Sequence, residues 1–100
     1  MRIIAKGTLK AFWETAQYKD AEQQLKSWYK VITEKDWKDP HDIIRYFPDA
    51  DQVGNGRIVF NICRNKYLLI VAFRYDLQIG FVRFTGTHKQ YDAIADIKNI

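Results

Sequence analysis

Three strand-like runs follow one another in residues 57–91, which read RIVFNICRNKYLLIVAFRYDLQIGFVRFTGTHKQY. The runs cover residues 57–62, 66–74 and 78–85, and only short polar breaks separate them. Connections this short favour neighbouring antiparallel strands, because parallel neighbours need a long crossover connection. We therefore expect a three-stranded meander at the centre of the fold.

The same segment carries the whole positive excess of the protein, whose formal net charge is +4. Asp76 is the only acid between residues 57 and 91, whereas the rest of the chain is close to neutral. The basic residues of the segment are Arg57, Arg64, Lys66, Arg74, Arg83 and Lys89. A basic surface on a platform of strands is typical of a protein that binds a phosphate-rich partner.

Alternation of side chains gives the middle run two different faces. One face would hold Tyr67, Leu69, Val71 and Phe73, and the other Lys66, Leu68, Ile70, Ala72 and Arg74. We expect the bulkier set to lie under helices, and the face with Lys66 and Arg74 to stay more open to solvent. Alternation does not decide the direction of Arg83, because its face would also hold Ile79 and Phe81.

The first third of the chain predicts a short strand and two helices. Residues 2–5 are short and partly β-branched, which favours a brief strand before a turn. Apolar residues then recur at helical spacing, which predicts helices over residues 8–18 and 20–35. Thr8 is the expected N-cap of the first helix, and Asp20 opens a sequence that resembles a capping box for the second.

Two local signals organise the middle of the chain. Asp39-Pro40 places a capping residue before a proline that suits the first helical position, so a short helix is expected there. Pro48 would end it. Gly54-Asn55-Gly56 is a strong turn signal and leads directly into the first strand of the meander.

A last helix is expected to begin at Thr87, because Thr87-x-x-Gln90 is a capping-box sequence. His88 and Lys89 would lie on its first turn. Free N–H groups at a helix start attract anions and disfavour a protonated imidazole, which would help His88 to act as a base. The residues expected to pack back onto the sheet are Tyr91, Ile94 and Ala95.

The predicted fold class is α+β, with an N-terminal strand and two helices packed on an antiparallel sheet and a short C-terminal helix. One hundred residues support one core, so residues 1–100 are expected to form a single domain. Cys63 is the only cysteine, which excludes an internal disulfide and a cysteine-rich metal site. With no signal-peptide pattern and no run of about 20 apolar residues, we expect a cytoplasmic protein that does not contact membranes.

An RNA-cleaving site deprotonates a 2′-hydroxyl, stabilises charge on the phosphate and protonates the leaving 5′-oxygen, and it needs no metal to do so. His88 and Tyr91 are candidates for the proton transfers, and Tyr91 or a lysine could replace His88 as the base. Candidates for binding the phosphate are Lys66, Arg74, Arg83 and Lys89. From residue types alone, a basic sheet that binds without catalysing remains the simpler interpretation.

Six motifs run through essentially the whole chain: Ala11-Phe12-Trp13, Asp36-Trp37, Phe47-Pro48-x-Ala50-Asp51, Val59-Phe60-Asn61-Ile62, Asn65-Lys66-Tyr67 and Arg83-Phe84-x-Gly86-Thr87-His88-Lys89-x-Tyr91-Asp92. Together they resemble the HigB family of bacterial toxins, relatives of RelE. The resemblance implies a ribosome-dependent mRNA endonuclease that inhibits translation, works without metal or cofactor and leaves a 2′,3′-cyclic phosphate. It also implies a helix-turn-helix antitoxin that neutralises the toxin, with DNA contacted only through their complex.

On this sequence, the resemblance maps these roles onto Lys66, Arg74, Arg83, His88, Lys89 and Tyr91. We expect catalytic roles for His88, Tyr91, Lys66 and Arg83, and RNA-binding roles for Arg57, Arg64, Arg74 and Lys89. The family commonly has arginine where this chain has Leu68. Losing that cation would weaken the activity, shift the role of the cation to Arg74 or Arg64, or abolish the activity. Two alternatives stay open: a module that binds RNA and antitoxin without cleaving, and a ParE-like inhibitor of DNA gyrase. The proton-transfer groups favour the nuclease, because a gyrase inhibitor needs none.

Overall fold

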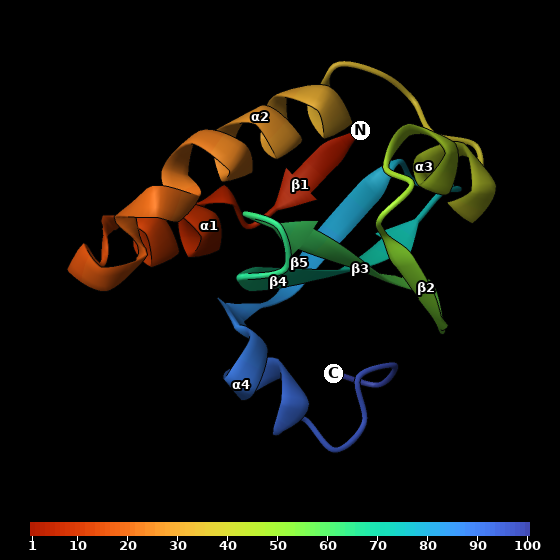
Figure 1. The fold of residues 1–100 in the computed structure, drawn as a ribbon. Coiled ribbons are helices and arrows are strands. Elements are labelled where there is room, and N and C mark those ends of the chain that lie inside the picture. The colour runs from red at the N-terminus through yellow and green to blue at the C-terminus, as the bar shows by residue number, and fades with distance from the viewer.

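A computed structural model describes residues 1–100 and arranges five strands in one sheet, in the order β1-β5-β4-β3-β2 (Figure 1). The predicted meander is confirmed, because β3, β4 and β5 pair as antiparallel neighbours. β2 adds a further antiparallel edge, whereas β1 pairs in parallel with β5, so the sheet is mixed. The strands are β1 (Arg2–Ile4), β2 (Asp51–Gly54), β3 (Arg57–Ile62), β4 (Tyr67–Arg74) and β5 (Ile79–Thr87).

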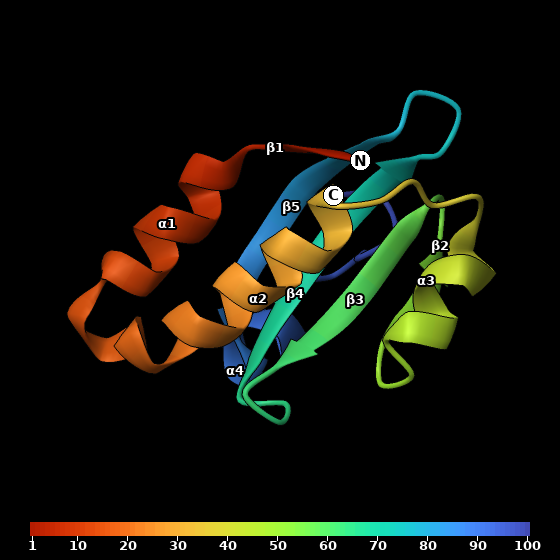
Figure 2. The same ribbon diagram turned by 90° about the horizontal axis from the view of Figure 1, so that it is seen from above.

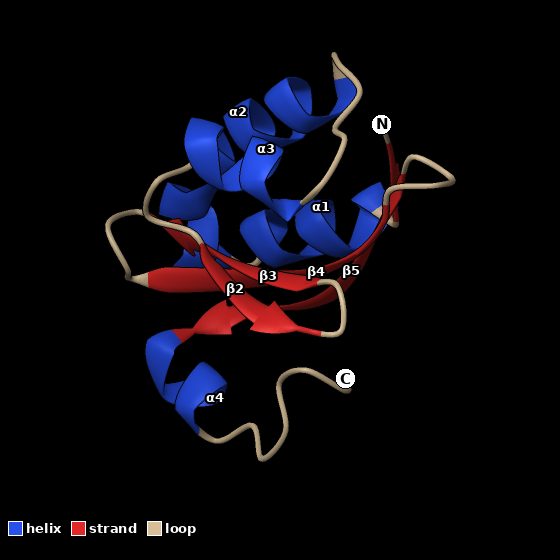
Figure 3. Ribbon diagram, turned by 90° about the vertical axis from the view of Figure 1, so that its right-hand side faces the viewer, coloured by secondary structure: helices blue, strands red, loops and turns tan.

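Helices cover the two faces of this sheet unequally (Figures 1 and 3). One face carries α1 (Lys6–Glu14), a 3₁₀ helix η1 (Ala16–Ala21), α2 (Glu22–Thr33) and α3 (Pro40–Tyr46). The view from above shows α2 lying over the sheet, α1 to the side of β5, and α3 beside β2 and β3 (Figure 2). The short helix α4 (His88–Asp92) and the C-terminal tail, residues 93–100, lie on the opposite face (Figure 3). The α+β class is therefore confirmed. No helix has both the length and the apolar character needed to cross a membrane.

Two of the predicted helix starts are wrong. The first helix begins before Thr8, at Lys6, and its N-cap makes no side-chain hydrogen bond. Asp20 does not cap the second helix, because it lies inside η1 and its carboxylate binds side chains of the β3–β4 turn instead. For Asp20, the local capping pattern competes with contacts that form only in the folded chain.

The other two predicted starts are confirmed. The Asp39 side chain accepts a hydrogen bond of 2.9 Å from the Asp42 N–H at the start of α3, with Pro40 in the first turn. At the start of α4, the Thr87 hydroxyl accepts from the Gln90 N–H at 3.2 Å, and the Gln90 side chain accepts from the Thr87 N–H at 2.9 Å. This is the predicted capping box.

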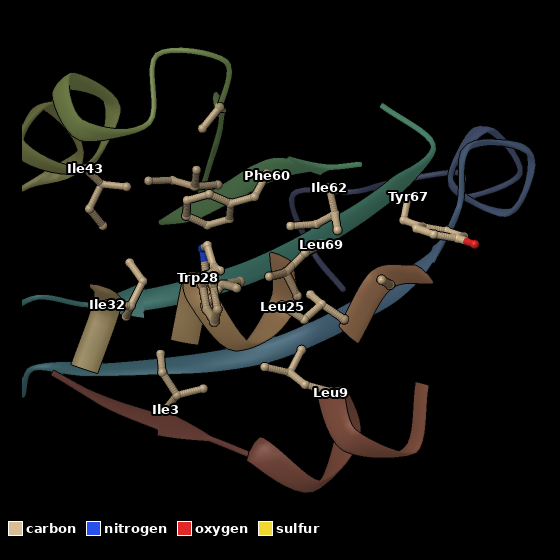
Figure 4. Packing of buried hydrophobic residues seen from close by; sticks show 14 of the residues in the cluster. Ile3, Leu9, Leu25, Trp28, Ile32, Ile43, Phe60, Ile62, Tyr67 and Leu69 are labelled. Atoms are coloured by element: carbon tan, nitrogen blue, oxygen red, sulfur yellow. The ribbon is translucent and has the colours of Figure 1, made fainter. Parts of the chain in front are cut away.

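The main core lies between the helices and the sheet (Figure 4). The four bulky residues predicted for the helix-facing side of β4 are all buried there. They pack with Leu9, Leu25 and Trp28 from the helices and with Phe60 from β3. Trp28 and Phe60 meet in an edge-to-face arrangement at 5.2 Å, which suits the quadrupoles of two aromatic rings.

The expectation that the opposite face of β4 is open is wrong. Leu68, only 3% exposed, joins Val59 and Ile70 in a second buried cluster. Partly buried side chains cover this cluster from β2, β5, α4 and the C-terminal tail: Val53, Phe84, Tyr91, Ile94, Ile97 and Ile100. Ala95, in contrast, is exposed instead of packing on the sheet. The isoleucines of the tail thus give the sheet a second apolar cover.

Hydrogen bonds fasten the C-terminal tail to the turn between β2 and β3. The Arg57 guanidinium donates to the Ile100 carbonyl oxygen at 2.7 Å and to the Asn55 carbonyl oxygen at 2.8 Å. The Asn55 side chain also donates to the Asn99 side chain at 2.7 Å. Arg57, which the sequence suggested for RNA binding, therefore has protein partners in this structure.

Candidate functional site

The junction between β5 and α4 fixes the position of the last helix. Gly86 leaves room for two side chains, because a Cβ atom at this residue would lie 2.6 Å from Gln90 Oε1 and 2.6 Å from the Phe84 ring, so both would have to move. The missing side chain lets Gln90 reach back to the Thr87 N–H and complete the capping box. The five-residue helix α4 therefore starts at one defined place, although it is too short to contribute much helix dipole.

This junction brings His88 and Tyr91 together. Their rings meet edge to face with centroids 6.0 Å apart. Tyr91 is partly buried against the second cluster, with its ring 6.5 Å from that of Phe84. The His88 side chain is 46% exposed, and its Nδ1 lies 3.1 Å from Asp92 Oδ2. An anchored phenol thus stands beside an accessible imidazole.

The surroundings of Tyr91 favour its protonated form. Burial raises the pKa of the Tyr91 hydroxyl, and the negative charges of Asp51 and Asp92 raise it further. Tyr91 therefore keeps its proton at neutral pH. It can donate a hydrogen bond or a proton to an oxygen of a substrate, but it is a poor base there.

Lys66 faces a different partner. Its ammonium group forms an ion pair with Asp20 of η1, and the Tyr67 hydroxyl donates to the same carboxylate at 2.6 Å. The hydrogen bond to Asp20 raises the pKa of Lys66, so the amine stays charged. No hydrogen bond or ion pair connects it with His88 or Tyr91.

Two of the predicted RNA ligands lie at the other end of the sheet. Arg74 closes β4, about 23 Å along the strand from Tyr67 at a rise of roughly 3.3 Å per residue. Its guanidinium donates hydrogen bonds to both carboxylate oxygens of Asp76, at 3.0 and 2.8 Å. Arg57 pairs with Ala72 near that same end and bonds to the tail. The structure does not bring Arg57 and Arg74 together with His88.

Arg83 owes its position to a β-bulge. Phe84 pairs with Ile70 and Val82 pairs with Val71, so Arg83 is the extra residue on β5. Strand alternation alone did not decide on which face of the sheet the Arg83 side chain lies, and the bulge decides it. The exposed guanidinium lies 5.3 Å from the centre of the Phe81 ring, which pairs with Ala72 on the face opposite the helices. Arg83 therefore points toward the face that also carries α4.

Of the six basic residues between positions 57 and 91, three make no hydrogen bond or ion pair through their side chains: Arg64, Arg83 and Lys89. Arg64 lies in the β3–β4 turn, where it is one of three consecutive residues with positive φ. This turn enters β4 at Tyr67, which pairs with Thr87 immediately before α4. Lys89 follows His88 directly. Within the basic segment, residues 57–91, the unpaired cations thus lie in β5, in α4 and in the turn that leads into β4.

Sequence reasoning missed Asp92 as a partner of His88. The signal was available, because residues four apart on a helix are neighbours. It also missed the bulge at Arg83, for which the sequence offers no signal, because a bulge depends on the register between strands. The neighbourhood of His88 forms an open surface. The two surface hollows, of about 280 and 540 Å³, are lined by other residues, mostly of the helices.

A family model described as a RelE-like toxic component of a toxin-antitoxin system matches residues 21–94, so the chain is a RelE-like toxin. Within that class, the chain belongs to the HigB toxin family. Toxins of this family are typically ribonucleases, and membership implies a cognate antitoxin. No curated protein matches the chain significantly.

Proposed function

We propose that this toxin is a metal-independent endoribonuclease that cleaves messenger RNA on the translating ribosome. The observation that carries the proposal is the pairing of an accessible imidazole, His88, with a protonated phenol, Tyr91. Lys89 follows His88 and has no ionic partner, and the unpaired Arg83 and Arg64 lie on β5 and in the turn that leads into β4. Cations of this kind can stabilise the negative charge of a reacting phosphate. A surface for binding alone would need the cations but no pair of proton-transfer groups.

In the proposed reaction, a base removes the proton of a ribose 2′-hydroxyl, and the 2′-oxygen attacks the adjacent phosphorus. The bond from phosphorus to the 5′-oxygen breaks, and that oxygen takes a proton from an acid. The products are a 2′,3′-cyclic phosphate and a free 5′-hydroxyl, and the proton held by the base returns through solvent. Tyr91 is suited to donate to the leaving oxygen or to the phosphate. Arg83 and Lys89 are suited to bind the phosphates on either side.

Two features of the site support a role for the ribosome. The surface around His88 has no hollow that could enclose a nucleotide, and the sheet face beside it is occupied by the C-terminal tail. An open site of this kind provides little positioning of its own, and positioning is a large part of catalysis. A second surface that already holds the message would supply it. We therefore propose the ribosome as a partner, in addition to the antitoxin.

Mapping the 5′ ends of cellular messages after brief induction tests this function directly. Cleavage should give new 5′ ends within translated regions, and His88→Gln and Tyr91→Phe should each slow single-turnover cleavage on programmed ribosomes by about 10² to 10⁴ fold. His41→Gln is the matched control, because His41 is also exposed but lies in α3, on the other side of the sheet.

The outcomes separate the possible functions. Intact messages together with retained ribosome or antitoxin binding would indicate a module that binds without cleaving. Intact messages together with inhibited gyrase would indicate a ParE-like inhibitor. Both variants cleaving within about threefold of the parent would exclude the two residues from proton transfer, since even the smallest general acid-base effect is larger.

A further inference from the structure

The His88–Tyr91 pair alone does not decide which group is the base. A neutral imidazole carries its proton on either Nδ1 or Nε2, and only the other nitrogen can accept a proton. The partner of one ring nitrogen decides which form is present. Asp92, four residues after His88 on α4, supplies such a partner, with Oδ2 at 3.1 Å from Nδ1.

His88 is held by neighbours on the same short helix. Asp92 contacts Nδ1, and the Tyr91 ring stands edge to face against the imidazole. The capping box fixes the first turn of α4, while Tyr91 is anchored on the second cluster. His88 and Asp92 are therefore held in register, and their contact does not depend on a long flexible loop.

We propose that Asp92 is a positioning residue that holds the His88 proton on Nδ1, so that Nε2 has a free lone pair and acts as the base toward the ribose 2′-hydroxyl. A carboxylate has no proton to donate at neutral pH, so Nδ1–H has to donate to it. The same carboxylate stabilises the imidazolium that forms when Nε2 takes the proton. This inference rests on the proposed nuclease function.

The charge of Asp92 also acts on Tyr91, which supports the same division of roles. It is one of the two carboxylates that raise the pKa of the Tyr91 hydroxyl in addition to burial. One acidic side chain thereby favours a phenol that keeps its proton and an imidazole that exposes a lone pair. Acid and base roles are separated when two groups differ in this way.

The tautomer of His88 can be measured without any activity assay. The chain has two histidines, His41 and His88, so ¹⁵N shifts of the ring nitrogens can be assigned to each of them. At about pH 8.5, where an ordinary histidine is neutral, the full-length protein should show His88 mainly with the proton on Nδ1. His41, which makes no side-chain hydrogen bond, should show the form that prevails in free histidine.

Substitution of Asp92 should change this signature. Asp92→Ala should return His88 to the pattern of His41, while Asp92→Glu should retain the Nδ1–H form because a carboxylate is still within reach. A parent protein in which His88 already matches His41 would overturn the proposal. A His88 signal that Asp92→Ala leaves unchanged would do the same. Peak positions elsewhere in the spectrum report whether each variant is folded.

Kinetics then connect the tautomer with the reaction. Asp92→Ala should slow single-turnover cleavage by about 10- to 100-fold, Asp92→Glu should recover most of the rate, and ribosome affinity should stay the same for both. If the parent protein does not cleave RNA, the proposed nuclease function is wrong, but the measured tautomer of His88 remains valid. Cleavage that needs His88 but is unaffected by Asp92→Ala would refute the role of Asp92 alone.

Discussion

Leu68 shows how burial changes the interpretation of a single residue. The resemblance to HigB toxins leads us to expect arginine here, and an exposed strand face would make the leucine a lost phosphate ligand. The side chain is instead 3% exposed, between Val59 and Ile70 in the second cluster. On β4 it pairs with Gly86, immediately before the capped start of α4. Leu68 is therefore part of the support for the site.

We predict that Leu68→Arg destabilises the protein. A guanidinium at this position would be buried without a carboxylate partner, which should lower the free energy of unfolding by roughly 3 kcal/mol or more. Leu68→Met, which conserves volume, should cost less than about 1.5 kcal/mol. Urea unfolding of both variants measures the difference. An arginine variant as stable as the parent would mean that the C-terminal tail readily moves away from Leu68.

Contacts between functional side chains could be predicted where the two residues are close in sequence. His88 and Tyr91 lie three residues apart on a helix whose capping sequence was recognisable, so their proximity was expected. The partner of Lys66 could not be predicted, because Asp20 is 46 residues away and meets it only when η1 packs on the β3–β4 turn. Such long-range ion pairs determine which cations are free to bind phosphate and which are already bound to a carboxylate.

At the scale of elements, Asp20 joins η1 to the β3–β4 turn. It accepts hydrogen bonds from Lys66 and Tyr67, and the Lys66 contact is the largest cause of a lowered pKa for the Asp20 carboxyl. A carboxyl with a lowered pKa binds its proton more weakly in the folded than in the unfolded state. Its contribution to stability is therefore complete above its ordinary value of 3.8 and is lost as the pH falls through the lower folded value.

Asp20→Asn should consequently be less stable than the parent near neutral pH. The two proteins should begin to converge in stability near the ordinary carboxyl value of 3.8 and converge further as the pH falls through the lower folded value. Thermal melts across an acid pH series provide the measurement. Asp49→Asn is a suitable control, because the Asp49 side chain is exposed and makes no hydrogen bond or ion pair. A stability difference that is the same at every pH would show that the Asp20 carboxylate does not couple these elements.

Helices and strands could be predicted from the sequence where residues nearby in the chain are enough to determine them. Asp39 and Thr87 cap helices within their own first turn, and short breaks determine the meander of β3, β4 and β5. The edge strand β2 was not predicted, because its four residues carry no alternating pattern and are held by pairing with β3. The parallel pairing of β1 with β5 joins opposite ends of the chain and has no local signal either.

At the scale of the whole molecule, the sheet has an apolar cover on both faces. A main cluster of 17 buried residues lies under the helices, and a smaller one lies under α4 and the C-terminal tail. Double substitution of Ile97 and Ile100 by serine should cost about 2 kcal/mol of unfolding free energy, because both side chains are partly buried. The main cluster should keep unfolding cooperative. Ala95→Ser, at an exposed tail position, should cost less than about 0.5 kcal/mol.

The overall charge distribution leads to a different prediction about binding. Basic residues are spread along the whole segment between residues 57 and 91. In the fold, however, Lys66 and Arg74 have acidic partners, whereas Arg83 and Lys89 do not. A phosphate has to displace a carboxylate to reach the first two, but only water to reach the others. Arg83→Ala and Lys89→Ala should each weaken ribosome or RNA association and reduce its logarithmic salt dependence by about one phosphate contact.

Arg74→Ala is the control for these two variants, because Arg74 is also an exposed arginine, but its guanidinium is paired with Asp76 at the far end of the sheet. It should leave both affinity and salt dependence close to those of the parent. Lys26→Ala, in α2 on the helical face, should behave in the same way, since Lys26 pairs with Glu22 at 2.6 Å. Equal losses in all four variants would mean that RNA senses the net charge of the molecule and not a site at the β5–α4 junction.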